Sequence, residues 1–130
     1  MNKRILILIE REPIAWARPG QNGRNRYDTQ RDIKNDLGRI ILSQLDNQSP
    51  LLQKISLQAE FHFRTPNKMK DVNRGGYHWK KPDIDNLLKF YLDLCQECGC
   101  FKNDSQICDV SMKKKYAWKY PYVSLCFTEI

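Results

Sequence analysis

Three carboxylates and one lysine stand at short spacings in the second half of the chain. Asp83 and Asp85 are separated by one residue, Lys89 follows Asp85 by four, and Asp104 precedes a predicted strand. Magnesium prefers hard oxygen ligands, usually a few carboxylates completed by water and substrate phosphate. A lysine beside such an ion can steady the charge that builds on the phosphate. The set therefore predicts magnesium-assisted phosphodiester hydrolysis.

Each of these residues also has a plainer interpretation. Asp83 can be only the N-cap of a helix, with its carboxylate accepting free backbone N–H groups. Asp85 and Lys89 can be only a surface pair in the favourable acid-first order, and Asp104 only a turn residue. The surrounding charge favours a metal-binding role over these plainer ones. A basic loop leads into Asp83, and carboxylates beside it would repel phosphate unless a cation lay between them. The sequence does not decide whether Asp104 lies beside the helix start or near its far end.

The charge of the chain is strongly positive and unevenly placed. The net charge is +7, and such a small basic domain attracts polyanions through counterion release. Residues 64–81 hold six cations against one acid, Asp71. Tyr77 and Trp79 stand within this stretch and can stack on exposed bases. The predicted DNA contacts are Arg18, Arg24, Arg26, Lys68, Lys70, Arg74, Lys80 and Lys81.

The first half of the chain predicts strand, loop, helix and strand. Branched residues at 3–10 indicate a buried strand, and the Pro- and Gly-bearing stretch 11–27 indicates a long loop. Apolar residues at helical spacing predict a helix over 29–45. Alternation over 53–64 is typical of a half-buried strand, and 65–81 is a second long loop.

The second half predicts the best-defined helix and two strands. The helix starts at Pro82-Asp83 and ends at Gly99. Its apolar stripe comprises Ile84, Leu87, Leu88, Tyr91, Leu92 and Cys95. Residues 106–117 and 120–128 indicate strands. We therefore expect one α+β domain over residues 1–130, with a mixed sheet of about four strands and two main helices, in the order β-α-β-α-β-β.

Two motifs resemble the signature of the RusA family of Holliday-junction resolvases. Asp83 to Lys89 matches a D-x-D-N-x-x-K helix, and Asp104-Ser105-Gln106 matches a D-x-Q segment that leads into a strand. The resemblance extends to residues 13–19 and 27–31, which are similar to the segments before and into the first helix of that family. It touches most of the chain, but its specific part is the combination of the two motifs.

The resemblance implies a homodimer that binds four-way DNA junctions and nicks two strands symmetrically with magnesium or manganese. By position, it makes Asp83, Asp85 and Asp104 metal ligands and Lys89 a catalytic lysine. Asn86 and Gln106 would support the hydrogen bonding of the site. A two-fold dimer suits a junction, because it presents two equivalent sites to equivalent strands. The resemblance also implies a setting in DNA recombination and repair, in a phage or its bacterial host.

Other classes of protein remain as alternatives. The main one is a non-catalytic branched-DNA-binding module that uses the basic loops and the aromatic residues. A nuclease acting on flaps would need the same residues. A zinc site is disfavoured, because Cys95, Cys98 and Cys100 offer one close group rather than two separated pairs. The run Ile5 to Ile9 is too short to cross a bilayer, so we expect a soluble, cytoplasmic protein.

Overall fold

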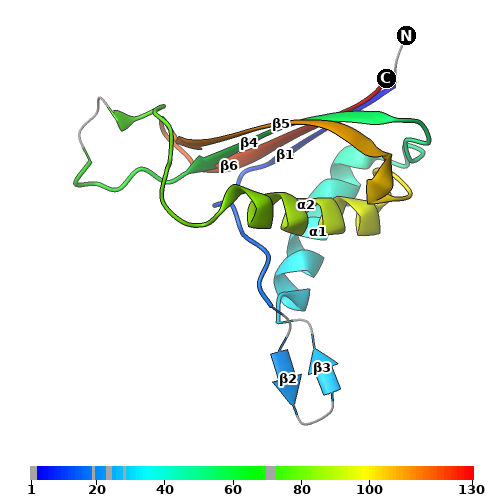
Figure 1. Cartoon of the computed structure of the whole chain (residues 1–130), viewed down its shortest axis with the longest axis horizontal. Coiled ribbons are helices and arrows are strands. Elements are labelled where there is room, and N and C mark those ends of the chain that lie inside the picture. Colours follow the sequence, from blue (N-terminus) through cyan, green and yellow to red (C-terminus); the bar gives the residue numbers. More distant parts are fainter. Residues whose placement is uncertain (1–2, 19, 23–24, 28, 70–72) are drawn as a thin grey trace.

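A four-stranded mixed sheet forms the centre of the molecule (Figure 1). Its strands lie in the order β1 (Arg4–Ile9), β6 (Tyr122–Glu129), β4 (Ile55–Phe63) and β5 (Ile107–Tyr116). β6 is antiparallel to both of its neighbours, whereas β4 and β5 run parallel and are joined through a helix. This computed structural model describes residues 3–18, 20–22, 25–27, 29–69 and 73–130.

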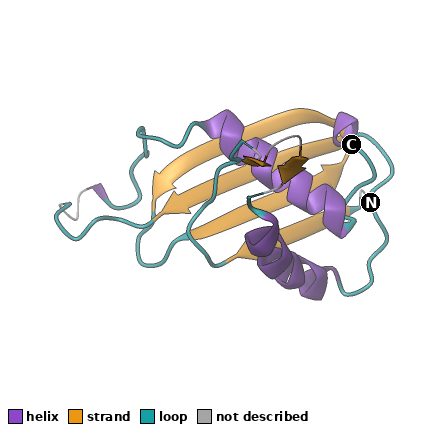
Figure 2. Cartoon of the chain, turned by 90° about the horizontal axis from the view of Figure 1, so that it is seen from below, coloured by secondary structure: helices purple, strands orange, loops and turns teal. Residues whose placement is uncertain are grey.

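Both main helices cover the same face of this sheet (Figure 2). They are α1 (Arg31–Leu45) and α2 (Ile84–Cys98). Arg31 at the start of α1 forms a two-pronged ion pair with Glu97 at the end of α2, with both N–O distances at 3.0 Å. Gly38 of α1 faces Cys98 of α2, and a Cβ at Gly38 would make an ordinary contact of 3.5 Å with Cys98 Sγ. The predicted class and element order are therefore confirmed: this is an α+β domain.

Two details of the predicted elements need correction. Within the stretch expected to be loop, β2 (Gly20–Asn22) and β3 (Asn25–Tyr27) form an antiparallel hairpin. Their polar residues give no alternating apolar signal. The buried face of α2 also includes Phe90 and Leu94, which the predicted stripe omits, while Leu88 and Leu92 are only partly buried. The stripe is shifted because the sheet meets α2 along the 87, 90, 91, 94 and 95 positions.

Both edges of the sheet are partly occupied by other segments. On β1, the Gln44 amide of α1 acts like a neighbouring strand, since its Oε1 accepts from the Leu8 N–H and its Nε2 donates to the Leu8 carbonyl. On β5, Tyr77 forms an antiparallel bridge with Lys115. These contacts satisfy backbone groups that an edge strand leaves open. No helix in the described part of the chain is long and apolar enough to cross a membrane.

Candidate functional site

A groove of about 650 Å³ opens where α2 begins, beside the edge strand β5. The loop before α2 supplies aromatic and basic residues, the start of α2 supplies two carboxylates, and β5 supplies two lysines. The residues concerned are Tyr77, His78, Trp79, Lys80, Lys81, Asp83, Ile84, Asp85, Met112, Lys113 and Lys114. The structure thus brings Asp83 and Asp85 together with the end of the basic loop, as the sequence predicts.

The two carboxylates are exposed and little used by the fold. Asp83 is the N-cap residue of α2, but its side chain makes no capping hydrogen bond, contrary to the expectation from sequence. Asp85 accepts one hydrogen bond, from the Asn86 N–H at 3.0 Å. Capping therefore does not explain why Asp83 is an acid. Both carboxylates keep oxygens available toward the groove.

Lys114 fixes the segment that carries Asp83. Its Nζ donates to the carbonyl oxygens of Lys80 at 2.6 Å and Pro82 at 2.5 Å. Sequence reasoning did not assign Lys113 or Lys114 to the site. The available signal was the run Lys113–Lys115, three consecutive cations within a predicted strand. Lys114 is thus a positioning residue, and exposed Lys113 adds positive charge to the groove wall.

His78 lies at the inner wall of the groove between two aromatic rings. Its imidazole stacks on Phe63 at 4.1 Å between centroids and meets Tyr116 at 4.9 Å. Its buried Nδ1 has no hydrogen-bond partner among the described residues. Burial, followed by the charges of Lys114 and Lys80, lowers the pKa of His78 below its ordinary value. The imidazole is therefore neutral at pH 7 and serves as a packing group.

Lys89 lies outside the groove lining, one turn further along α2. Its Nζ lies 3.8 Å from the centroid of the Trp16 ring. The segment around Trp16 is tied to α2, since the Trp16 N–H donates to the Asn86 carbonyl and the Ile14 N–H donates to the Tyr91 hydroxyl. The predicted catalytic lysine is therefore positioned by the segment before α1, a relationship that no local motif predicts.

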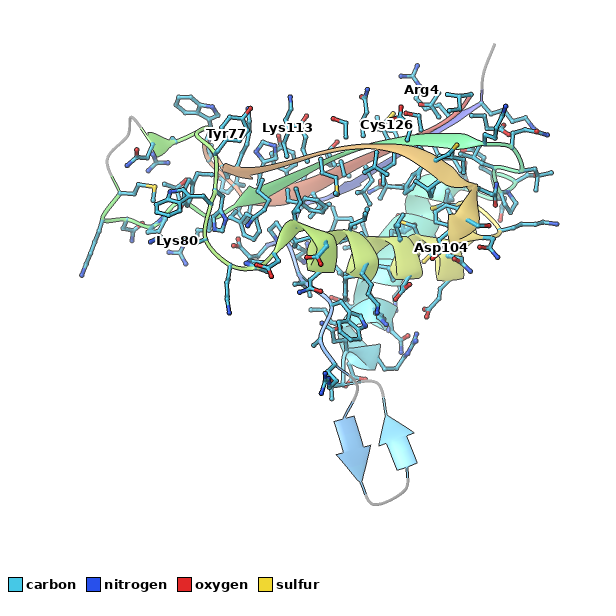
Figure 3. The ribbon with its side chains drawn as sticks, viewed as in Figure 1. Arg4, Tyr77, Lys80, Asp104, Lys113 and Cys126 are labelled. Carbon is cyan, nitrogen blue, oxygen red and sulfur yellow. The ribbon has the colours of Figure 1, made fainter. Side chains whose placement is uncertain are left out.

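Asp104 lies at the opposite end of α2 from the groove (Figure 3). Its backbone N–H donates to Gln96 Oε1 in the last turns of the helix. At 1.5 Å per residue, the helix separates this position from Asp83 by roughly 20 Å. Gln106 fixes the turn, since its side chain makes four hydrogen bonds to backbone groups, those of Leu51, Gln53, Lys102 and Asn103. One chain therefore does not place Asp104 beside the other two carboxylates.

The surroundings of Asp104 are acidic as well as basic. Burial raises the pKa of Asp93, and Asp104 and Glu97 add to this rise while Lys34 and Lys89 oppose it. Within the part of the chain that the structure describes, no group of three or more His, Cys, Asp or Glu residues is arranged to hold a metal ion. The predicted three-carboxylate set is thus divided between the two ends of α2.

The predicted DNA contacts are spread over three regions. Lys80 and Lys81 line the groove, and Arg74 donates from Nη1 to the Trp118 carbonyl at 2.8 Å. Arg18 and Lys68 are exposed away from the lining. Arg24, Lys70 and the side chain of Arg26 lie outside the described residues. Among the predicted contacts that the structure describes, Lys80 and Lys81 are the ones that line the groove together with Asp83 and Asp85.

The cysteine cluster belongs to the helix packing. Cys95 and Cys100 are buried, and Cys98 is half-buried against Gly38. The contact with Cys100, together with burial, raises the pKa of the Cys95 thiol well above its ordinary value. Burial raises the pKa of Cys98 to about 11. Protonated thiols of this kind pack as small apolar groups.

Comparison with known families gives a match over most of the chain. A sequence model described as "Endodeoxyribonuclease RusA" matches residues 11–125, which span both carboxylate motifs and the groove. A search of curated proteins gives no match.

Proposed function

Because this chain belongs to the RusA family of endodeoxyribonucleases, we propose that it resolves four-way DNA junctions by magnesium-dependent paired nicks. One observation carries the proposal: two exposed carboxylates, Asp83 and Asp85, open onto a groove whose other lining residues are mostly lysines and aromatic side chains. Lysines attract the phosphate backbone, and the carboxylates then need a cation between themselves and that phosphate. A four-way junction as substrate would place the reaction in DNA recombination and repair.

The donor chemistry of the groove fits magnesium. Mg²⁺ is usually bound through one or two carboxylates plus water and substrate phosphate, so Asp83 and Asp85 can hold it. Asp83 supports this role because the helix does not use its carboxylate as a cap. The ion would supply charge neutralisation and a hydroxide nucleophile at neutral pH, and manganese has the same ligand preference.

The residues of the chain itself have separate tasks in this proposal. Lys80, Lys81 and Lys113 bind phosphates along the groove, and Lys114 holds the backbone that presents Asp83. Trp79, 84% exposed, offers a face to the substrate. Lys89, held over Trp16, would stabilise charge that develops on the phosphate.

The position of Asp104 suggests that the proposed homodimer completes each site with a carboxylate from the other subunit. A two-fold axis that sets the two α2 helices antiparallel would bring Asp104 of the partner subunit to the carboxylates of the groove. An isologous dimer makes this exchange reciprocal, so each of two equivalent sites would receive a third carboxylate. Two such sites suit paired nicks across a symmetric junction.

The first test incubates a labelled four-way junction with the protein, with and without magnesium, beside Asp85→Asn. Paired symmetric nicks that need both magnesium and Asp85 support the proposal. Tight junction binding without cuts under several divalent metals would instead identify a non-catalytic DNA-binding module.

A mixing test addresses Asp104. Subunits carrying Asp85→Asn are allowed to exchange with subunits carrying Asp104→Asn. If Asp104 acts across the dimer, each heterodimer regains one intact site, and single nicks return. An inactive mixture, with exchange verified by differently tagged subunits, would reject the shared site. An active Asp104→Asn homodimer would show that Asp83 and Asp85 suffice.

A further inference from the structure

A second hollow, of about 720 Å³, lies at the turn between β5 and β6. Half of its lining residues are aromatic, namely Trp118, Tyr120, Tyr122 and His62, and Leu8 of β1 lies among the others. Trp118 is 69% exposed and Tyr120 is 70% exposed. Neither Asp83 nor Asp85 lines it. Figure 1 shows that this turn and the long loop before α2 lie at the same end of the molecule.

The aromatic rings of this hollow are held in place by the fold. Trp118 lies directly against Gly75, where a Cβ would come within 2.4 Å of its Nε1. Gly75 is itself fixed, since its N–H donates to the Tyr116 carbonyl at 2.9 Å. Tyr122 stacks on His62 with centroids 4.1 Å apart and planes 11° apart. Rings that are already ordered lose little conformational freedom when they bind a ligand.

The charges around the hollow favour a base over a phosphate. Lys119 and Glu10 line it with opposite charges, so the lining is close to neutral. Lys119 Nζ lies 5.4 Å from the centroid of the Tyr120 ring, and Arg74 holds the Trp118 carbonyl. Cations next to exposed aromatic faces are the combination that binds single-stranded nucleic acid, with bases on the rings and the backbone beside the cations.

We propose that this hollow, at the same end of the molecule as the groove with Asp83 and Asp85, binds unpaired nucleobases of single-stranded DNA, with Trp118 as the stacking platform. The inference rests on the proposed function in one respect, that the substrate is branched DNA. An unpaired strand is available where a branch opens, and it would be held at the same end of the molecule as the groove.

The test measures binding of an oligothymidylate of about 12 nucleotides that carries 2-aminopurine, in EDTA and with the full-length protein. Stacking on Trp118 should quench the 2-aminopurine fluorescence. Trp118→Ala should abolish the quenching and weaken the affinity by roughly tenfold, as expected for the loss of one base–aromatic stack. Trp118→Phe, which keeps a flat ring, should retain most of both, and a thermal melt of each variant verifies the fold.

The outcomes separate this inference from the proposed nuclease activity. Binding in EDTA does not depend on cleavage. If the protein quenches the fluorescence but cuts no junction, the proposed base-binding hollow is supported and only the proposed nuclease activity is contradicted. An unchanged affinity and unchanged quenching in folded Trp118→Ala would overturn the inference. Conversion of Trp118→Ala from dimer to monomer, with single-strand affinity unchanged, would also overturn it and assign the hollow to contact between copies.

Discussion

The ammonium group of Lys89 lies 3.8 Å from the centroid of the Trp16 ring, which joins α2 to the segment before α1. The backbone of that segment is held by the Asn86 carbonyl and the Tyr91 hydroxyl. A lysine has four rotatable bonds and would otherwise sample many positions. The ring of Trp16 therefore selects one of them, one helical turn from Asp85.

This contact should contribute measurably to stability. Trp16→Ala and Lys89→Met, alone and combined, form a double-mutant cycle read by urea unfolding. We expect a coupling free energy of about 0.5–1 kcal/mol, the range of a partly exposed cation–π pair. Additive effects of the two changes would show that the contact stabilises nothing.

Lys89→Ala should reduce the cleavage rate far more than the affinity for the junction. The reason is that a charge placed near the reacting phosphate acts mainly as negative charge develops there. Single-turnover cleavage and gel-shift binding measure the two effects separately. Parallel losses of binding and cutting would identify Lys89 as a phosphate clamp.

Asp85→Asn should lower cleavage by about a hundredfold or more and leave junction binding equal or tighter. The change removes a negative charge that repels phosphate and keeps the size of the side chain. Asp32→Asn is the matched control, because Asp32 is also an exposed acid in the first turn of a helix, α1. Equal loss of binding and cutting, or an effect of the control of the same size, would indicate a structural role.

Gly75→Ala should destabilise the protein more than Gly99→Ala. Both glycines have positive φ, 75° and 90°, so each change costs about 1–2 kcal/mol of backbone strain. A Cβ at Gly75 also meets the Trp118 ring, whereas one at Gly99 meets nothing within 4 Å. The difference between the two free energies of unfolding therefore measures the Trp118 contact. Equal values would mean that Trp118 moves aside without cost.

His78→Phe should reduce the decrease in the free energy of unfolding that accompanies acidification. The pKa of His78 is lower in the folded protein than its ordinary value of 6.5, so the folded state favours the neutral ring. The free energy of unfolding is therefore unaffected by this group above pH 6.5 and decreases as the pH falls below 6.5. Phe keeps the stacking on Phe63 and Tyr116 and cannot be protonated. Urea unfolding of both proteins at about pH 7.5 and pH 5 measures the change. An identical pH dependence would contradict the assignment.

Much of the fold was predictable because its signals are local. Alternation in β4 and β6 follows from one buried and one open face, and Gly99 ends α2 in the left-handed conformation that glycine favours. The hairpin of β2 and β3 was missed because its polar residues carry no such pattern.

The candidate site was only half predictable. Asp83 and Asp85 share the start of one helix, so their proximity follows from sequence spacing. The place of Asp104 depends on how the chain returns from α2 to β5, which spacing does not encode. Lys113 and Lys114 reach the groove only because β5 is an edge strand, a property set by the order of the whole sheet.

The four hydrogen bonds of Gln106 fix the turn that carries Asp104 at the end of α2, so the length of α2 sets the distance between Asp104 and the groove. The turn that carries Asp104 cannot swing toward the groove without losing its ties to Leu51 and Gln53 ahead of β4. The interval between the acidic ends of α2 is then set by the number of helical residues, and each residue inserted would add about 1.5 Å and a rotation of about 100°. If two subunits share their carboxylates, the same helix length also determines how far apart the two cuts fall on DNA.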